Sequence, residues 1–265
     1  MEREEFSLID THTHAYYIED PADQSALLER CATNHVHKLL LPNVDRESIA
    51  AVQAMQAHFP DQCFAMMGLH PCNVKADYQE QLTEIEQALN SGKVWGVGEI
   101  GLDLYWDQST IAMQVEAFKI QTEWAKELDL PVSIHCRAAY DELFELLEEI
   151  QDGRLRGVLH CFTGTEEQAW RTIDFGLFLG IGGVVTFKNA GLDRVVEKIP
   201  LEHLVLETDS PYLAPVPFRG KQNESSYLLH IAKKVADLHT KTVNEVAKIT
   251  TGNAVKIFRL NEGSK

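Results

Sequence analysis

The stretch VWGVGEIGLDLYWDQSTIAMQVEAFKIQTEWAKELDLPVSIHCR, residues 94–137, holds the pattern that decides the fold. A short apolar run opens it, a longer segment with apolar residues three and four positions apart follows, and a second short apolar run closes it. These patterns are typical of a strand, an amphipathic helix and a further strand. The stretch therefore predicts one βα unit of a parallel sheet and the strand of the next.

The same alternation continues along the whole chain. The predicted strands cover residues 7–14, 38–44, 63–71, 94–103, 131–137, 157–163, 177–187 and 203–211. The predicted helices cover residues 25–35, 47–59, 80–92, 111–129, 140–150, 166–176, 193–200, 225–238 and 242–260. Eight strands, each followed by a helix, favour an α/β fold of the (β/α)8 TIM-barrel type with an extra C-terminal helix. We expect a single domain over residues 1–265; with one strand fewer, an open doubly wound sheet would fit equally well.

Composition limits the classes of function. The 265 residues include 24 Lys and Arg against 40 Asp and Glu, a net charge of −16. This balance argues against a broad basic surface that grips nucleic acid without sequence preference. The charged N-terminus lacks the apolar core of a signal peptide, and no apolar run reaches the ~18 residues of a membrane span. We expect a cytoplasmic protein that binds no membrane and needs no obligate protein partner.

Five of the eleven histidines fall within or at the carboxyl ends of predicted strands. They are His12, His14, His70, His135 and His160. Two acids in similar positions, Glu99 and Asp209, join them. In a barrel these strand ends meet on the face that carries the active site. Imidazoles and carboxylates together are the ligands of zinc, manganese and iron, so the sequence predicts a metal site; the other six histidines are expected to be surface or capping residues.

His12 and His14 give the strongest local signal. Residues two apart in a strand project to the same side, so both imidazoles can bind one ion. The same alternation predicts that Cys136 and Cys161, which directly follow His135 and His160, point toward the surrounding helices. The five cysteines include no Cys-x-x-Cys pair, and we expect reduced thiols.

In order and spacing, seven motifs of this chain resemble those of the TatD family of metal-dependent deoxyribonucleases, a (β/α)8 branch related to the amidohydrolases. The motifs are DTHTH, GLHP, GEIGLD, LPVSIHCRAAYDE, HCFTG, GGVVTFKNA and LETDSPYLAPVPFRGKQNE, followed by the ITTGNAVKIF tail. The resemblance implies that one metal ion is held by His12, His14, Glu99 and Asp209. It implies that a second ion is held by Glu99, His135 and His160, with Glu99 between the two ions. Mg, Mn or Zn would each suit such ligands.

The resemblance further implies a deoxyribonuclease of the 3′ to 5′ exonuclease type, acting on single-stranded DNA or on 3′ ends. Its hydroxide, formed at the two-metal centre, would attack phosphorus, with Asp209 and Glu99 as catalytic residues. The candidates for binding the substrate are His70, Arg137, Arg219 and Lys221. Because the chain is acidic, we expect weak and distributive binding to DNA.

Three other functions remain open from the sequence. The same centre could hydrolyse the ester of D-aminoacyl-tRNA, or an amide or lactone as in the wider amidohydrolase group. A scaffold without enzymatic activity is disfavoured because all six proposed ligands are present. The chain also departs from the family pattern at Ala15 and Tyr16, where a leucine and an acid are usual, at Cys72, and at Ser225. These departures concern the substrate cleft and none of them replaces a proposed metal ligand.

Overall fold

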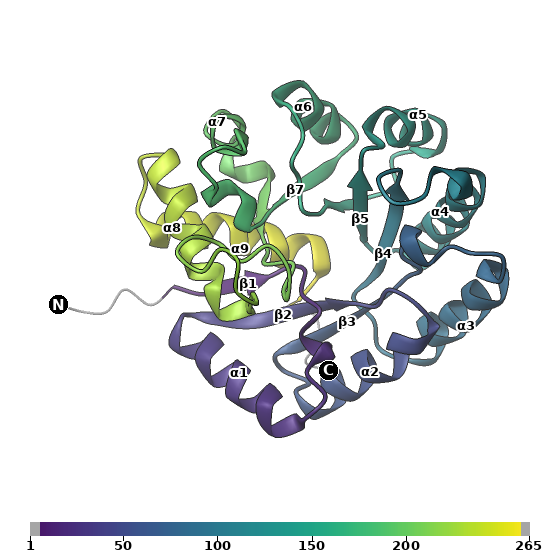
Figure 1. Ribbon diagram of the computed structural model, residues 1–265, viewed down its shortest axis with the longest axis horizontal. Helices are drawn as coiled ribbons and strands as arrows, with labels where there is room; N and C mark the ends of the chain where they lie inside the picture. The colour runs from purple at the N-terminus through teal and green to yellow at the C-terminus, as the bar shows by residue number, and fades with distance from the viewer. Residues whose placement is uncertain (1–5, 261–265) are drawn as a thin grey trace.

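The computed structural model describes residues 6–260, and its centre is a sheet of eight parallel strands (Figure 1). The strands follow each other around the sheet in the order of the sequence, from β1 to β8. They are β1 (Leu8–Asp10), β2 (Val36–Pro42), β3 (Cys63–Met67), β4 (Gly96–Asp103), β5 (Val132–Arg137), β6 (Gly157–Leu159), β7 (Leu177–Ile181) and β8 (Leu204–Leu206).

The sheet closes on itself where β1 meets β8. The Thr11 amide donates to the Leu206 carbonyl at 3.1 Å, and Thr13 pairs with Ser210 in a parallel bridge just beyond the two strands. The prediction of a (β/α)8 barrel is confirmed, and the open doubly wound sheet is not formed.

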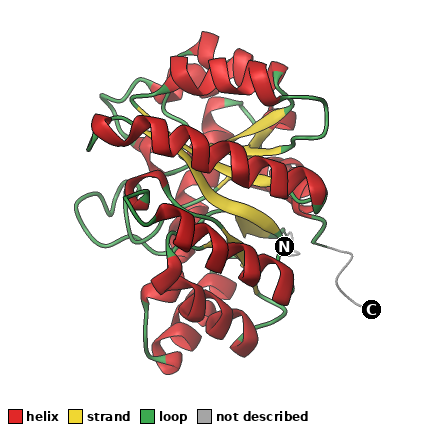
Figure 2. Ribbon diagram, turned by 90° about the vertical axis from the view of Figure 1, so that its right-hand side faces the viewer, coloured by secondary structure: helices red, strands yellow, loops and turns green. Residues whose placement is uncertain are grey.

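Helices surround the strands on the outside (Figure 2). They are α1 (Pro21–Thr33), α2 (Ile49–His58), α3 (Tyr78–Ser91), α4 (Ile111–Glu127), α5 (Tyr140–Ile150), α6 (Glu166–Asp174), α7 (Leu192–Val196), α8 (Leu228–Leu238) and α9 (Val243–Phe258). One helix follows each strand and α9 is the expected extra helix. Within residues 6–260, none of the helices combines the length and the apolar character needed to cross a bilayer.

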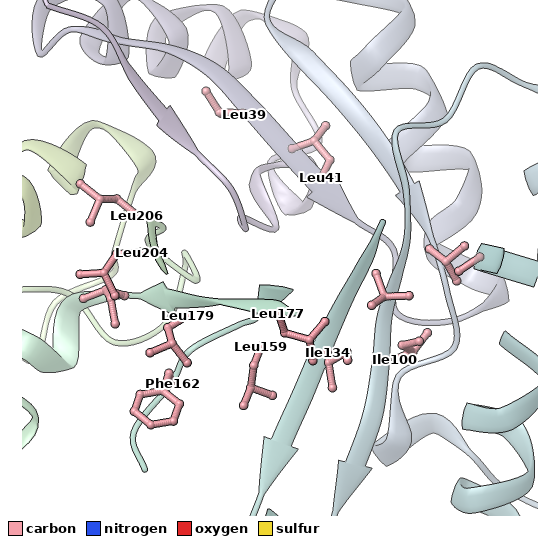
Figure 3. Close-up of a cluster of buried hydrophobic side chains, with 14 of the residues drawn as sticks. Leu39, Leu41, Ile100, Ile134, Leu159, Phe162, Leu177, Leu179, Leu204 and Leu206 are labelled. Carbon is pink, nitrogen blue, oxygen red and sulfur yellow. The ribbon is translucent and has the colours of Figure 1, made fainter. Parts of the chain in front are cut away.

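Alternate residues of a strand serve two different parts of the core, as the period of two requires. Leu39 and Leu41 of β2 belong to the large cluster between the strands and the helices (Figure 3). Leu40, between them, packs with Ile9 and Val205 in a second cluster drawn from β1, β2, β3, β6 and β8. Residues of α9 join this second cluster, including Phe258. The extra helix therefore packs against side chains of the barrel interior.

Four strands, β1, β6, β7 and β8, are less than half as long as predicted, and β7 shows the reason most clearly. The pattern of residues 177–187 predicts a continuous strand, whereas β7 ends at Ile181 and Gly183–Thr186 form a short 3-10 helix, η5. A side chain at Gly183 would lie 2.0 Å from the Leu213 carbonyl oxygen, so only a glycine lets the two backbones approach this closely. The β-branched residues after the two glycines therefore turn over the barrel mouth instead of extending the sheet.

Candidate metal centre

A cavity of about 790 Å³ opens at the carboxyl ends of the strands. Its lining includes His14, His70, Glu99, His135, His160 and Asp209, which come from the ends of six strands. His12, fully buried, lies beneath them and contacts Glu99 and Asp209. All five strand-end histidines and both acids predicted from the sequence are thus brought together.

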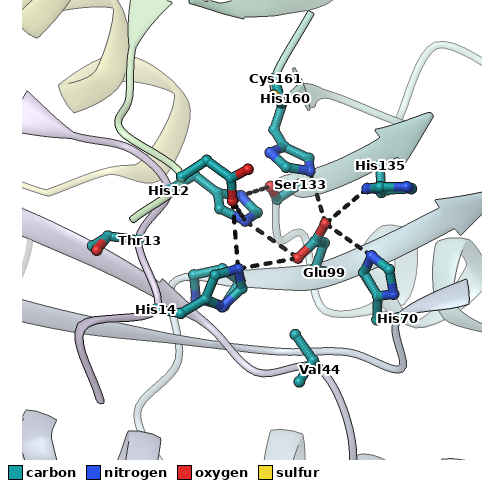
Figure 4. A network of polar contacts seen from close by, with 12 residues as sticks. His12, Thr13, His14, Val44, His70, Glu99, Ser133, His135, His160 and Cys161 are labelled. Atoms are coloured by element: carbon teal, nitrogen blue, oxygen red, sulfur yellow. Dashed lines mark hydrogen bonds and ion pairs between the residues drawn. The ribbon is translucent and has the colours of Figure 1, made fainter. Parts of the chain in front are cut away.

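Glu99 lies at the centre of the cluster, with histidines on two sides (Figure 4). Its Oε2 is 3.2 Å from His12 Nε2 and 3.6 Å from His14 Nε2. Its Oε1 is 2.7 Å from His160 Nε2 and 3.1 Å from His135 Nδ1. Each oxygen of one carboxylate therefore faces a different set of histidines.

Asp209 completes the group around His12 and His14. Its Oδ1 lies 4.0 Å from His12 Nε2 and 3.6 Å from His14 Nε2. Backbone bonds across the barrel seam hold this arrangement, because the Asp209 amide donates to the His12 carbonyl at 2.9 Å and the His14 amide to the Ser210 carbonyl at 2.8 Å. Thr13 points the other way, its hydroxyl 2.6 Å from that of Ser210. The two imidazoles share one side although the strand itself ends at Asp10.

Tyr16, one of the departures from the family pattern, orients His14. Its buried hydroxyl donates to the Pro42 carbonyl at 2.9 Å, and the same oxygen lies 2.9 Å from His14 Nδ1. Because its hydrogen is used by Pro42, the Tyr16 oxygen accepts the hydrogen of His14 Nδ1. The neutral His14 ring then presents a lone pair on Nε2 toward Glu99 and Asp209, as a metal ligand requires.

His70 is oriented in the opposite sense. The Cys72 amide donates to His70 Nδ1 at 3.1 Å, so the neutral ring carries its hydrogen on Nε2. That nitrogen is 3.2 Å from Glu99 Oε1. His70 therefore presents a hydrogen-bond donor to the centre of the site, which suits binding of an anion better than ligation of a metal.

Two buried acids near the histidines were not identified from the sequence. Asp103 Oδ2 lies 2.9 Å from His135 Nε2, and Glu207 Oε1 lies 3.5 Å from His160 Nδ1 while it accepts from the Cys161 amide. Acids behind metal-binding histidines fix the orientation of the rings. Asp103 could have been found, since it lies four residues after Glu99 on the same face of one strand. Glu207 carries a similar signal, since it lies two residues before Asp209 in the strand predicted over residues 203–211.

The alternation expected for the two strand-end cysteines holds only in part for Cys136 and fails for Cys161. Cys136 packs against the core between strands and helices, but it also borders the cavity. Cys161 follows the end of β6, takes a φ of 45° and lines the cavity, which corrects its predicted direction. Burial first, and then the Asp209 carboxylate, raise the pKa of the Cys161 thiol well above its usual value. This thiol is therefore protonated at neutral pH and is a poor nucleophile.

The buried charges in the cluster shift one another's pKa. Burial alone would raise the pKa of Glu99, but His70, His160 and His12 hold it well below its usual value. Burial would lower the pKa of His160, yet Glu99 and Glu207 raise it well above the usual range. Burial, followed by the charge of His160, lowers the pKa of His12. Protons and metal ions therefore compete for the same nitrogens, and binding a metal releases protons.

The donor atoms fit a divalent metal ion. His12 Nε2 and both ring nitrogens of His160 are buried and have no hydrogen-bond partner among the described residues. The contact of 2.7 Å between His160 Nε2 and Glu99 lacks the alignment of a hydrogen bond. Three sets of residues each bring three ligand atoms within 4.8 Å of one another. They are His12, His14 and Asp209; His12, Glu99 and His160; and His70, Glu99 and His135. Buried nitrogens left unpaired beside carboxylates are what a nitrogen and oxygen metal site requires.

The predicted cations for substrate binding lie in different places. Arg137 lines the cavity, and its guanidinium lies over the rings of Tyr105, at 3.8 Å, and Trp106, at 5.4 Å. Arg219 belongs to the loop after β8, and its guanidinium lies 4.5 Å above the ring of Phe187. Arg219 and Lys221 are exposed and are not among the residues that line the cavity.

Comparisons with known proteins agree with the geometry. The family model described as TatD related DNase matches residues 9–259. The chain is 38% identical to an uncharacterized metal-dependent hydrolase of Bacillus subtilis, over 96% of this chain and all of the relative. It is 33% identical to the 3′-5′ ssDNA/RNA exonuclease TatD of Yersinia pseudotuberculosis, over 90% and 94% of the two chains. The crystal structure of the TatD homologue YjjV of Escherichia coli superposes with a TM-score of 0.89 and 32% identity, over 95% and 98% of the two chains.

Proposed function

Since this chain belongs to the TatD-related DNase family of metal-dependent hydrolases, we propose that it removes nucleotides from the 3′ ends of single-stranded DNA. The relative from Yersinia, named an exonuclease on single-stranded DNA and RNA, supports this direction and leaves RNA as a second substrate of the same chemistry. The proposal places the enzyme in the cytoplasm, in keeping with its five free cysteines.

The position of Glu99 is the observation that carries the proposal. Its two oxygens face two separate sets of histidines, His12 and His14 at 3.2 and 3.6 Å from Oε2, and His160, His135 and His70 at 2.7, 3.1 and 3.2 Å from Oε1. One carboxylate between two sets of ligands suits a pair of divalent cations. His12, His14 and Asp209 would hold the first, His135 and His160 the second, and Glu99 both. When bound, such a pair lowers the pKa of coordinated water and stabilises the attacking and leaving oxygens of a phosphodiester.

Asp209 has the position and the charge to handle the proton of the attacking water. Burial would raise the pKa of Asp209, but its contact with His14 and the charges of His160 and His12 lower it. Asp209 is therefore a carboxylate at neutral pH, able to orient a water molecule and to receive its proton.

The substrate phosphate would be held by donors around the same cavity. His70 Nε2 carries a hydrogen directed into the site, and the Arg137 guanidinium lies at the mouth. Negative charge that develops on the phosphoryl oxygens is stabilised by such fixed donors. Arg219 and Lys221, on the exposed loop after β8, would contact the strand further from the bond that is cleaved.

The test compares substrates on metal-stripped protein reloaded with Mg, Mn or Zn. Single-stranded DNA labelled at its 3′ end, D-aminoacyl-tRNA and a lactone would be offered in parallel. We expect metal-dependent shortening of the DNA, and we expect Glu99→Gln to lower kcat at least about 10³-fold, or about 4 kcal/mol. His37→Ala, which removes an exposed histidine of β2, is the matched control and should keep full activity.

The outcomes test the nuclease activity and the location of the catalytic site separately. Cleavage of the aminoacyl ester or the lactone with no loss of DNA ends would reject the nuclease and keep the metal-dependent hydrolase. Unchanged activity in both His12→Ala and Glu99→Gln would show that this cluster is not the catalytic site.

A further inference from the structure

Four aromatic side chains at the mouth of the cavity are exposed to solvent. The exposed fractions are 70% for Trp106, 58% for Tyr105, 53% for Tyr212 and 45% for Tyr17. Large aromatic side chains normally bury most of their surface, so a group of exposed ones beside a reactive centre indicates a binding surface. Trp106, Tyr212 and Tyr17 all line the cavity that contains Glu99.

These side chains form two groups on opposite sides of the barrel mouth. Tyr105 and Trp106 directly follow β4, whereas Tyr17 follows β1 and Tyr212 follows β8. In the ring of eight strands, β1 and β8 lie across from β4 and β5. The metal ligands therefore lie between the two aromatic groups.

The group after β4 is held in place. One oxygen of Asp103 accepts from the amides of Tyr105, at 2.9 Å, and Trp106, at 3.2 Å. The other oxygen contacts His135 at 2.9 Å. Arg137 lies over both rings. One buried acid thus contacts both this aromatic group and a predicted metal ligand, so the two aromatic rings and the reacting centre are positioned by the same residue.

The group on the other side is also packed on a metal-centre residue. The ring of Tyr17 stacks on His14, with centroids 5.4 Å apart and planes 16° from parallel. Tyr212 meets the same imidazole edge to face at 6.2 Å. Both tyrosines nevertheless keep about half of their surface exposed. Each side of the mouth therefore offers a fixed ring with a free face.

The charge around the cavity favours stacking over phosphate contacts. Of the described Lys and Arg residues, Arg137 alone lines the cavity, beside four acids: Asp45, Glu99, Asp103 and Asp209. Proteins that bind strands through the backbone use many cations, whereas an aromatic ring contributes about 1–3 kcal/mol for each base that stacks on it. Stacking needs an unpaired base with a free face, which a duplex does not offer.

We propose that Tyr105 and Trp106 on one side, and Tyr17 and Tyr212 on the other, clamp the terminal bases of a single-stranded nucleic acid. The strand end is held by base stacking, and the phosphodiester next to it then reaches Glu99. The inference rests on the proposed function and adds which part of the substrate the enzyme recognises. It recognises unpaired bases at the strand end rather than a run of backbone phosphates. Binding should weaken little with salt, since few protein cations displace counterions.

The test uses two DNA strands of equal length, one normal and one without bases at its last three nucleotides. Both have the same phosphodiester backbone. We expect the enzyme to prefer the normal strand, and Trp106→Ala to lower kcat/KM on that strand about 5- to 150-fold, the equivalent of 1–3 kcal/mol of stacking. On the strand without bases Trp106→Ala should change nothing, and Trp106→Phe should restore most of the loss. Trp170→Ala, at an exposed tryptophan of α6, is the matched control.

A second measurement does not depend on cleavage. The normal strand should quench the fluorescence of Trp106 in metal-loaded Glu99→Gln protein, and the strand without bases should not. Equal cleavage of both strands, or equal quenching by both, would overturn the clamp and leave the nuclease intact. If neither strand is cleaved by the metal-loaded enzyme, the proposed function fails, and quenching without preference for bases would then overturn the clamp as well.

Discussion

The role of Tyr16 leads to a sharp prediction about metal affinity. Tyr16→Phe keeps the ring and removes the oxygen that accepts from His14 Nδ1 and donates to the Pro42 carbonyl, both at 2.9 Å. Tyr16 is 2% exposed, so water has little access to replace the hydroxyl. His14 then loses the contact that fixes its ring and its tautomer.

The magnitude follows from the two lost bonds. A buried polar group left without a partner costs about 1–3 kcal/mol, so the free energy of unfolding of the metal-free protein should fall by about that amount. Loss of the residue that orients a ligating histidine typically weakens metal binding 10- to 100-fold. We expect a weakening within this range, because His14 is one of several proposed ligands and the others remain in place.

Isothermal titration of Mn or Zn into metal-stripped protein measures the affinity, and urea unfolding measures the stability. Tyr78→Phe is the matched control, because it removes a hydroxyl on α3 that accepts from Gln79 at 3.3 Å, away from the cavity. A metal affinity of Tyr16→Phe within twofold of both the parent and the control would refute the orientation of His14 by Tyr16.

Three further predictions follow from other parts of the structure. Chelation should lower Tm, and a metal at 100 times its Kd should restore about 2.7 kcal/mol of stability; scanning calorimetry that finds no change would contradict a metal site in the folded state. Hydrogen bonds from Arg259 and Arg156 lower the pKa of Asp129 below its usual value of 3.8. The ionised Asp129 therefore stabilises the fold fully above that pH, and this contribution is lost as the pH falls through the lowered pKa. Urea unfolding of Asp129→Asn should show a loss of at most about 1 kcal/mol at pH 7 that shrinks below pH 4, and a loss independent of pH would argue against the ion pairs. Gly101→Ala should destabilise by at least about 2 kcal/mol, since its Cβ would lie 1.9 Å from the His135 carbonyl oxygen. Gly92→Ala should have little effect, because its Cβ would make only an ordinary contact, 3.8 Å from the Ala88 carbonyl oxygen.

Local pattern in the sequence was sufficient to predict the fold and to predict which histidines and acids meet at the barrel mouth. Apolar residues at a period of two and at three and four positions apart depend only on neighbours along the chain, so eight strands and their helices could be predicted. The topology of a barrel places the strand ends on one face, so His12, Glu99 and Asp209 are grouped by the order of the strands alone. The family resemblance added the expected division of ligands between two ions.

The tertiary structure decided how those residues are oriented and what surrounds them. The tautomers of His14 and His70 depend on partners in other loops, Tyr16 with Pro42 and the Cys72 amide. The direction of Cys161 depends on a left-handed backbone that begins where the strand ends.

Periodicity holds only while the strand continues. The functional contacts lie beyond the strand ends, where hydrogen bonds between segments far apart in the sequence set the geometry. For this reason the sequence by itself determined which side chains meet at the barrel mouth, and only the folded chain determined which lone pairs, hydrogens and aromatic faces they present there.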